Sequence, residues 1–179
     1  MTKKRIGTVW LGGCSGCHMS LLDIDERVLD VAKLADIVKS PIVDGKEFPD
    51  VDVALVEGAI CNDEHLEEIK HIRKKSKILI SFGDCAVTAN VPSYRNQYTK
   101  EEALNRAYVE AESNDDKCVM PTSNEIAKLI DRVRPLHEVV KVDYYLPGCP
   151  PSADLIFYVL FELLSDRVPH LDKDRLKYG

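Results

Sequence analysis

The chain has 179 residues, of which 45% are hydrophobic and 30% are charged, and its formal net charge is −6. This size and composition predict one folded domain over residues 1–179 and argue against a disordered chain. The acidic charge excludes a typical nucleic-acid-binding protein, and no apolar run reaches the roughly 18 residues of a membrane span. The N-terminus lacks the apolar core of an export signal, so we expect a cytoplasmic protein.

Strand-like and helix-like segments alternate along the chain, as judged from apolar runs, helical spacing and capping residues. In chain order, we expect a strand at 4–11, a helix at 20–35, strands at 36–41 and 51–58, a helix at 62–75 with Asn62 as N-cap, a strand at 77–84, helices near 100–112 and 123–133, a strand at 137–148 and a helix at 152–166. This alternation predicts an α/β fold. We expect a flavodoxin-like open parallel sheet with helices on both faces and strand order 2-1-3-4-5.

Five of the six cysteines follow predicted strands. Cys14 and Cys17 follow the first predicted strand, Cys61 follows the third, Cys85 the fourth and Cys149 the fifth. Because the carboxyl ends of the strands are the ligand-binding edge of such a sheet, we expect these thiols to converge there. The sixth, Cys118, lies in a polar loop and is interpreted as a bystander.

The CxxC pair formed by Cys14 and Cys17 has several interpretations when it is taken alone. It is typical of a redox disulfide or of half a zinc site, and its glycine-rich turn also suits a flavin phosphate. A redox pair leaves Cys85 and Cys149 without a role, and structural zinc sites use two close-spaced pairs. A four-thiolate iron–sulfur cluster fits the number of cysteines best, with Cys61 as the rival fourth ligand.

Two polar residues lie close to the predicted edge. Glu57 ends a buried strand, where its carboxylate is placed to relay protons, orient a turn, act as an oxygen ligand, or simply cap or contact a neighbour. His18 follows Cys17, where it faces the cluster or a partner, or is an ordinary polar residue at the start of a helix. Glycines and prolines beside the CxxC pair and the last two thiols favour turns whose N–H groups face an anion.

The motifs CSGC, VEGAI, FGDC and PGCPP together resemble the small subunit of [NiFe] hydrogenases, whose fold is similar to that of the 20-kDa subunit of respiratory complex I. The resemblance covers roughly residues 4–165. The adjacent cysteines typical of the complex I subunit are absent from this sequence. CSGCHMS and DCAVTANVPSYRN look most like the small subunit of the soluble, bidirectional, NAD-reducing type.

The resemblance implies a set of ligands. The positions that match the ligands of the family's proximal [4Fe–4S] cluster are Cys14, Cys17, Cys85 and Cys149. Cys61 and Cys118 match no ligand position, and Glu57 matches the acidic residue of the EG motif. No catalytic residue is implied in this chain, although a proton-transfer or cluster role for Glu57 stays open.

The resemblance also implies partners and a reaction. H₂ is cleaved at a nickel–iron centre in a hydrogenase large subunit, and the cluster relays electrons to ferredoxin-like and flavin-bearing diaphorase subunits that reduce NAD⁺. The fold is compatible with FMN in this chain, but no residue requires it. Two other functions stay open: a complex I-like subunit coupled to quinone, and a non-catalytic module that senses H₂ or serves as a cluster scaffold.

Overall fold

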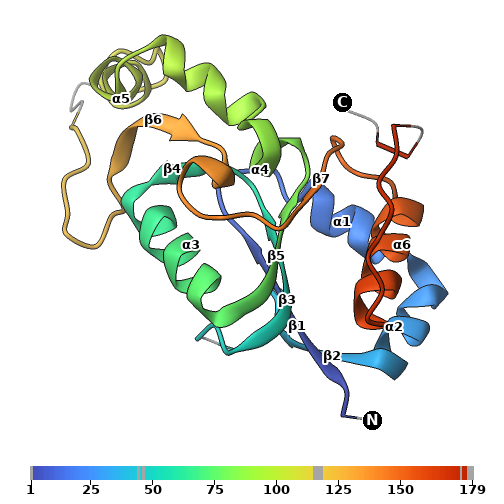
Figure 1. Cartoon of the computed structure of the whole chain (residues 1–179). Coiled ribbons are helices and arrows are strands. Elements are labelled where there is room, and N and C mark those ends of the chain that lie inside the picture. Colours follow the sequence, from blue (N-terminus) through green and yellow to red (C-terminus); the bar gives the residue numbers. More distant parts are fainter. Residues whose placement is uncertain (1, 44, 46, 115–118, 174, 177–179) are drawn as a thin grey trace.

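A computed structural model describes residues 2–43, 45, 47–114, 119–173 and 175–176. Its centre is a five-stranded parallel sheet in the order β2-β1-β3-β5-β7 (Figure 1). The strands are β1 (Lys4–Trp10), β2 (Ala35–Lys39), β3 (Val51–Glu57), β5 (Ser76–Phe82) and β7 (Tyr144–Leu146). The predicted α/β class, parallel sheet and strand order are therefore confirmed.

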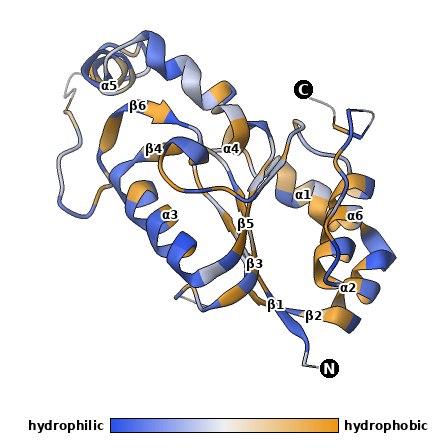
Figure 2. Cartoon of the chain, viewed as in Figure 1, coloured by the Kyte–Doolittle hydropathy of each residue, from blue (hydrophilic) through white to orange (hydrophobic). Residues whose placement is uncertain are grey.

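Helices cover both faces of this sheet (Figure 1). One face carries α1 (Gly16–Leu22), α2 (Val28–Leu34) and α6 (Ala153–Leu164), and the other carries α3 (Asp63–Lys75) and α4 (Asp84–Thr88). Because side chains alternate along a strand, Leu55 packs in the core under α6 while its neighbour Ala54 packs in the core under α3. Figure 2 shows the resulting pattern, with hydrophobic strands between helices whose outer faces are hydrophilic.

Capping residues fix the starts of three helices. The Asn62 side chain accepts a hydrogen bond from the backbone N–H of His65 at 2.8 Å, which confirms the predicted N-cap of α3. Thr99 and Glu102 form the predicted capping box of α5 (Lys100–Tyr108). Ser152 caps α6 in the same way as Asn62 caps α3.

The helix predicted over residues 20–35 is wrong in its bounds. The chain becomes helical earlier, at Gly16, and α1 ends at Leu22. Asp25 then adopts a left-handed φ of 56°, which a continuous right-handed helix does not tolerate. A short 3₁₀ turn, η1 (Asp25–Arg27), leads into α2.

The helix predicted near 123–133 is also wrong. Strand β6 (Leu129–Arg134) occupies the last part of that stretch and pairs antiparallel with β4 (Ile60–Asn62), so the two form a second, two-stranded sheet. The Asn96 side chain of η2 (Val91–Gln97) holds β6 from the other side, through hydrogen bonds to the backbone N–H and C=O of Val133. Pairing with distant segments thus outweighs the local capping signal.

The strand predicted over 137–148 is much shorter in the structure. Its first part is a 3₁₀ turn, η3 (Leu136–Glu138), and β7 covers only Tyr144–Leu146. Within the described part of the chain, no helix is both long and apolar enough to cross a membrane.

Candidate functional site

Four thiols meet at the carboxyl edge of the parallel sheet. Cys14 lies in the turn after β1, Cys17 in the first turn of α1, Cys85 in the first turn of α4 after β5, and Cys149 in the turn after β7. The other three thiols all act electrostatically on Cys17, and Cys14 and Cys149 act on Cys85. Of the five thiols predicted to converge at this edge, these four lie together, whereas the prediction is wrong for Cys61, which lies on β4.

The site is open on one side. Cys14 and Cys149 are exposed, Cys85 is half-buried and Cys17 is buried. Trp10, at the end of β1, and Met19, in α1, are 44% and 58% exposed close to the same edge. A group held by the four thiols would thus rest on the protein at Cys17 and face outward at Cys14 and Cys149.

The environment of the thiols disfavours four free thiolates. Burial raises the pKa of the Cys17 thiol well above its usual range, and the negative charges of Glu57 and the other thiols raise it further. Burial also raises the pKa of Cys85 to about 11, with Cys14 and Cys149 as the next causes. Metal cations between the sulfurs reverse this balance, because a thiol that coordinates a metal is deprotonated.

The four thiols form an all-cysteine donor set. Cys14 and Cys149 act electrostatically on both Cys17 and Cys85, so the four side chains lie near one another. Among the described residues, no group of three or more His, Cys, Asp or Glu side chains is arranged to hold one metal ion. All-thiolate donor sets of this kind are the usual ligands of iron–sulfur clusters.

A glycine allows the turn after β5 to approach Cys17. Gly83 has a φ of 83°, and a Cβ atom there would lie 2.1 Å from the Cys17 Sγ atom. That backbone conformation is also one that residues with side chains rarely adopt. Gly83 is thus required both for the shape of the turn and for the position of the buried thiol.

Hydrogen bonds connect the turns that carry the thiols. The backbone N–H of Asp84 donates to the Gly148 carbonyl at 2.9 Å, and the Gly148 N–H donates to Asp84 Oδ1 at 2.7 Å. The Ser20 hydroxyl of α1 donates to the Pro151 carbonyl at 2.5 Å. The turn after β7 is therefore tied both to the turn after β5 and to α1.

The carboxylate of Glu57 lies under the turn of the CxxC pair. Glu57 is 1% exposed, and its Oε1 atom accepts a hydrogen bond from the Cys17 backbone N–H at 3.3 Å. Its Oε2 atom accepts one from the His18 backbone N–H at 3.0 Å and lies 2.5 Å from His18 Nδ1. Of the roles considered for Glu57, these contacts support the orientation of a turn.

His18 is a core residue. It is 5% exposed, and its ring lies edge-on to the rings of Trp10 and Phe82, at centroid distances of 5.4 and 5.9 Å. The His18–Glu57 pair was not predicted, because 39 residues separate the two side chains. The available signal was a carboxylate at the end of a buried strand, next to a helix start that carries a histidine.

Cys61 lies apart from the four thiols, on β4. Its half-buried thiol donates to the Ala59 carbonyl at 3.6 Å, and a Cβ atom on Gly12 would lie 2.1 Å from its sulfur. Burial raises the pKa of this thiol, and the nearby guanidinium of Arg95 opposes the shift. Cys118 lies outside the described residues.

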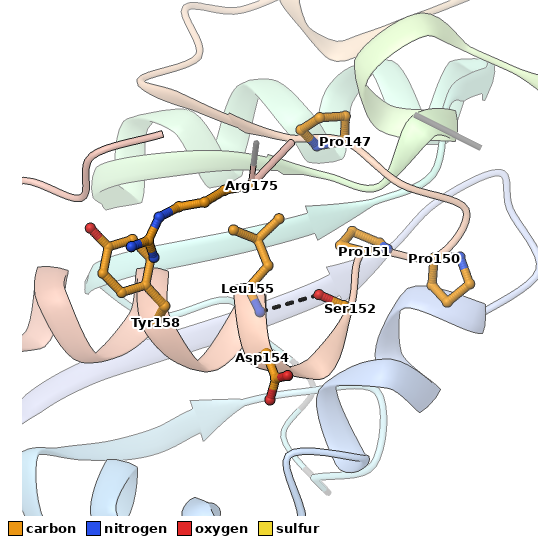
Figure 3. A pocket seen from close by; sticks show the side chains of 8 residues that line it. All are labelled: Pro147, Pro150, Pro151, Ser152, Asp154, Leu155, Tyr158 and Arg175. Atoms are coloured by element: carbon orange, nitrogen blue, oxygen red, sulfur yellow. Dashed lines mark hydrogen bonds between the residues drawn. The ribbon is translucent and has the colours of Figure 1, made fainter. Parts of the chain in front are cut away.

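A cavity of about 340 Å³ adjoins the turn that carries Cys149 (Figure 3). Pro150 and Pro151 form one wall, and Tyr158 of α6 and Arg175 form another. The guanidinium of Arg175 lies 4.2 Å from the centre of the Tyr158 ring, so this wall is closed by a cation–π contact. The cavity shapes the outer side of the PGCPP turn.

The fold and the site define a class of protein: a parallel α/β domain that gathers cysteines at the carboxyl edge of its sheet. Residues 14–163 match the family model described as NADH ubiquinone oxidoreductase, 20 Kd subunit. The match covers most of the chain, and the chain belongs to this family.

Hydrogenase subunits are among its relatives. The chain is 43% identical over 166 residues to a subunit of the F420-non-reducing hydrogenase of Methanothermobacter marburgensis, covering 91% of this chain and 54% of that subunit. It is 39% identical over 168 residues to the NAD-reducing hydrogenase HoxS subunit delta of Cupriavidus necator, covering 92% and 80% respectively. The chain spans between 54% and 58% of the length of three F420-non-reducing hydrogenase subunits that it matches.

One solved structure superposes almost completely. A chain in the crystal structure of NAD⁺-reducing [NiFe]-hydrogenase in the H₂-reduced state has a TM-score of 0.96 and 40% identity, covering 99% of this chain and 100% of that one. The resemblance to hydrogenase small subunits, inferred from the cysteine motifs, is therefore confirmed.

Proposed function

We propose that this chain is the electron-transfer small subunit of an NAD-reducing [NiFe] hydrogenase and holds one proximal [4Fe–4S] cluster. The observation that carries the proposal is the meeting of Cys14, Cys17, Cys85 and Cys149 at one sheet edge, within a chain of this family. When bound, such a cluster accepts and releases one electron at a time. H₂ cleavage belongs to a large subunit with a nickel–iron centre, and NAD⁺ reduction to ferredoxin-like and flavin-bearing diaphorase subunits.

The chain's own residues hold and orient the ligands. Cys17 provides a buried sulfur, fixed from below by its backbone hydrogen bond to Glu57 and from the side by Gly83. Cys14 and Cys149 supply the exposed sulfurs, so electrons enter and leave through the open side. Because a partially exposed cluster needs cover from water, we propose that the large subunit covers this side in a cytoplasmic complex.

The F420-non-reducing hydrogenases among the relatives give a second candidate function, a hydrogenase whose electron acceptor is not NAD⁺. Two of the F420-non-reducing hydrogenase subunits reach 43% and 45% identity, slightly above the 39% of HoxS subunit delta. The TM-score of 0.96 with the NAD⁺-reducing enzyme favours NAD⁺. The quinone-coupled and H₂-sensing alternatives predict no H₂-dependent NADH formation.

Metal analysis of the purified complex tests the cluster. Relative to the wild-type complex, we expect Cys149→Ala to lose about four irons and four labile sulfides per copy of this chain, together with the EPR signal of one reduced [4Fe–4S] cluster. The nickel–iron centre contributes iron too, so the spectroscopic signal and labile sulfide, not total iron, decide the result. Zinc in place of labile sulfide would overturn the proposal.

A comparison of electron acceptors tests the coupling. The complex that co-purifies with this chain should form NADH from NAD⁺ under H₂, and should also reduce benzyl viologen. Reduction of the viologen without formation of NADH would leave the hydrogenase assignment in place and reject the NAD-coupled type. Activity with neither acceptor would favour a sensor or scaffold.

A further inference from the structure

The buried imidazole of His18 has no role in the function proposed above. His18 and Glu57 are 5% and 1% exposed, and their side chains meet inside the protein. Burying two such polar groups costs free energy, which their mutual contact offsets only in part. Apolar residues of similar size would fill this position at no greater cost, so packing alone does not account for the pair.

A row of three side chains across the sheet supports the imidazole. Trp10, Glu57 and Phe82 are register partners at the ends of β1, β3 and β5. Register partners in a parallel sheet project from the same face, so these three side chains lie side by side. The ring of His18 lies edge-on to the Trp10 and Phe82 rings, at interplanar angles of 73° and 62°. Its Nδ1 atom reaches the carboxylate in the middle of the row, so the orientation of the ring is fixed from both sides.

His18 holds one oxygen of the Glu57 carboxylate with two donors. Oε2 accepts from the His18 backbone N–H at 3.0 Å and lies 2.5 Å from Nδ1. Because Glu57 acts on Cys17 as a negative charge, its carboxylate only accepts hydrogen bonds, and the proton of this contact belongs to Nδ1. A carboxylate is planar, so fixing Oε2 also fixes Oε1, which accepts from the Cys17 N–H at 3.3 Å. His18 therefore determines how the carboxylate meets Cys17.

The same carboxylate acts on the thiols through its charge. After burial, the charge of Glu57 is the next cause that raises the pKa of Cys17, and it also contributes to the raised pKa of Cys85. A negative charge beside a cluster disfavours the addition of an electron, since net charge and hydrogen bonds both contribute to cluster potentials. The hydrogen bond from Nδ1 draws part of this charge toward the imidazole and so weakens its effect.

We infer that His18 is a positioning residue for the Cys17 ligand. Its Nδ1–H group holds the Glu57 carboxylate against the Cys17 backbone N–H and moderates the charge that the carboxylate presents to the thiols. Residues that orient ligands in this way act without touching the metal. The inference rests on the proposed function, in which Cys17 is a ligand of the cluster.

Two substitutions of His18 separate the hydrogen bond from the packing. His18→Asn places an amide NH₂ where Nδ1 lies and so keeps a donor for Glu57. His18→Leu introduces a side chain of nearly the same shape as asparagine but without a donor. Both variants lose the outer half of the ring, and with it the same packing against Trp10 and Phe82. A difference between the two variants therefore reports the hydrogen bond to Glu57.

Redox titration of the purified complex is the first measurement, followed by the EPR signal that Cys149→Ala removes. We expect the midpoint potential of His18→Asn to stay near that of the wild type. The midpoint of His18→Leu should be more negative, because the charge of Glu57 is then no longer shared with a donor at this position. Equal shifts in the two variants, or no shift in either, would overturn the inference. A wild-type complex from which Cys149→Ala removes neither a signal nor labile sulfide would instead reject the proposed function.

Crystal structures of the same three complexes give a second readout that needs no cluster. In the wild type and in His18→Asn, Glu57 Oε1 should accept from the Cys17 N–H. In His18→Leu, the carboxylate should turn away from this N–H. A carboxylate that occupies the same position in all three structures would overturn the inference, whether or not a cluster is bound.

Discussion

The start of α1 and strand β4 each hold a thiol that packs against a glycine. The two regions differ in what surrounds the sulfur atom. Cys17 lies against Gly83, and Cys61 lies against Gly12, with the same 2.1 Å between the sulfur and the Cβ atom that each glycine lacks. Cys17 is joined electrostatically to three further thiols and to Glu57. Cys61 faces a carbonyl and a guanidinium instead. Close packing of a thiol against a glycine therefore does not indicate a metal ligand. The convergence of thiols from separate strands does indicate one.

Replacing each thiol tests this difference most directly. Cys17→Ala removes one of the four proposed ligands, so the purified complex should lose the EPR signal of this cluster and about four labile sulfides relative to the wild type. Cys61→Ala is the matched control, since it also removes a packed thiol. It should retain both. Loss of the cluster in Cys61→Ala, with retention in Cys17→Ala, would show that Cys61 is a ligand and Cys17 is not.

Replacing each glycine with alanine is expected to have the next largest effect. Gly83→Ala places a side chain at a φ of 83° and against Cys17 Sγ, so strain of about 1–3 kcal/mol adds to the clash. Gly12→Ala meets the Cys61 sulfur without a positive φ. Thermal unfolding of the complex should show a lowered midpoint for both variants.

Double variants separate the two causes. Adding Cys61→Ala removes the sulfur that Gly12→Ala meets, so most of the lost midpoint should return. Adding Cys17→Ala to Gly83→Ala relieves the clash but leaves the backbone strain in place, so it should restore a smaller share of the lost midpoint. Equal recovery in both pairs would show that the conformation of Gly83 carries no cost.

Glu57 and His65 accept hydrogen bonds from the backbone N–H groups of Cys17 and Cys61, and we expect their substitution to have a smaller effect. Glu57→Gln replaces one of the two accepting oxygens with an NH₂ group, so the backbone N–H of either Cys17 or His18 loses its acceptor. We expect this loss to cost about 1–3 kcal/mol and to alter the EPR spectrum of the proposed cluster. His65→Ala removes the Nδ1 atom that accepts from the Cys61 N–H at 3.3 Å. That N–H is only partly buried, so the cost should stay below about 1 kcal/mol and the spectrum should not change. An unchanged EPR spectrum in Glu57→Gln would show that Glu57 packs in the core without influencing the cluster.

Much of the fold could be predicted because local signals and the parallel sheet agreed. Apolar runs such as Val51–Glu57 identify buried strands, and Asn62 and Thr99 mark helix starts whose caps the structure confirms. Strand β6 could not be predicted, because its partner β4 lies 65 or more residues away along the chain. Asp25 interrupted a helical pattern through a backbone conformation that hydrophobic periodicity does not report.

The site was predictable in its ligand candidates and not in their support. Cys14, Cys17, Cys85 and Cys149 follow strands of the parallel sheet, so the fold class alone places them at one edge. Cys61 also follows a predicted strand, but it lies on β4, apart from the other four. The support depends on side chains that meet across the fold: Glu57 with His18, and Asp84 with Gly148. Such pairs leave no periodic or motif signal in a single sequence.

The hydrogen bonds between the turns have a consequence for the electron transfer proposed for this site. Asp84 ties the turn after β5 to the turn after β7, and Ser20 ties the latter to α1, through contacts that involve no sulfur. The positions of the thiols are therefore set by the polypeptide before any charge arrives. A scaffold fixed in this way deforms little when an electron is added or removed, so the reorganisation energy of the transfer is low. Rigidity of the backbone, rather than the thiols themselves, would then determine how fast the site can pass charge in either direction.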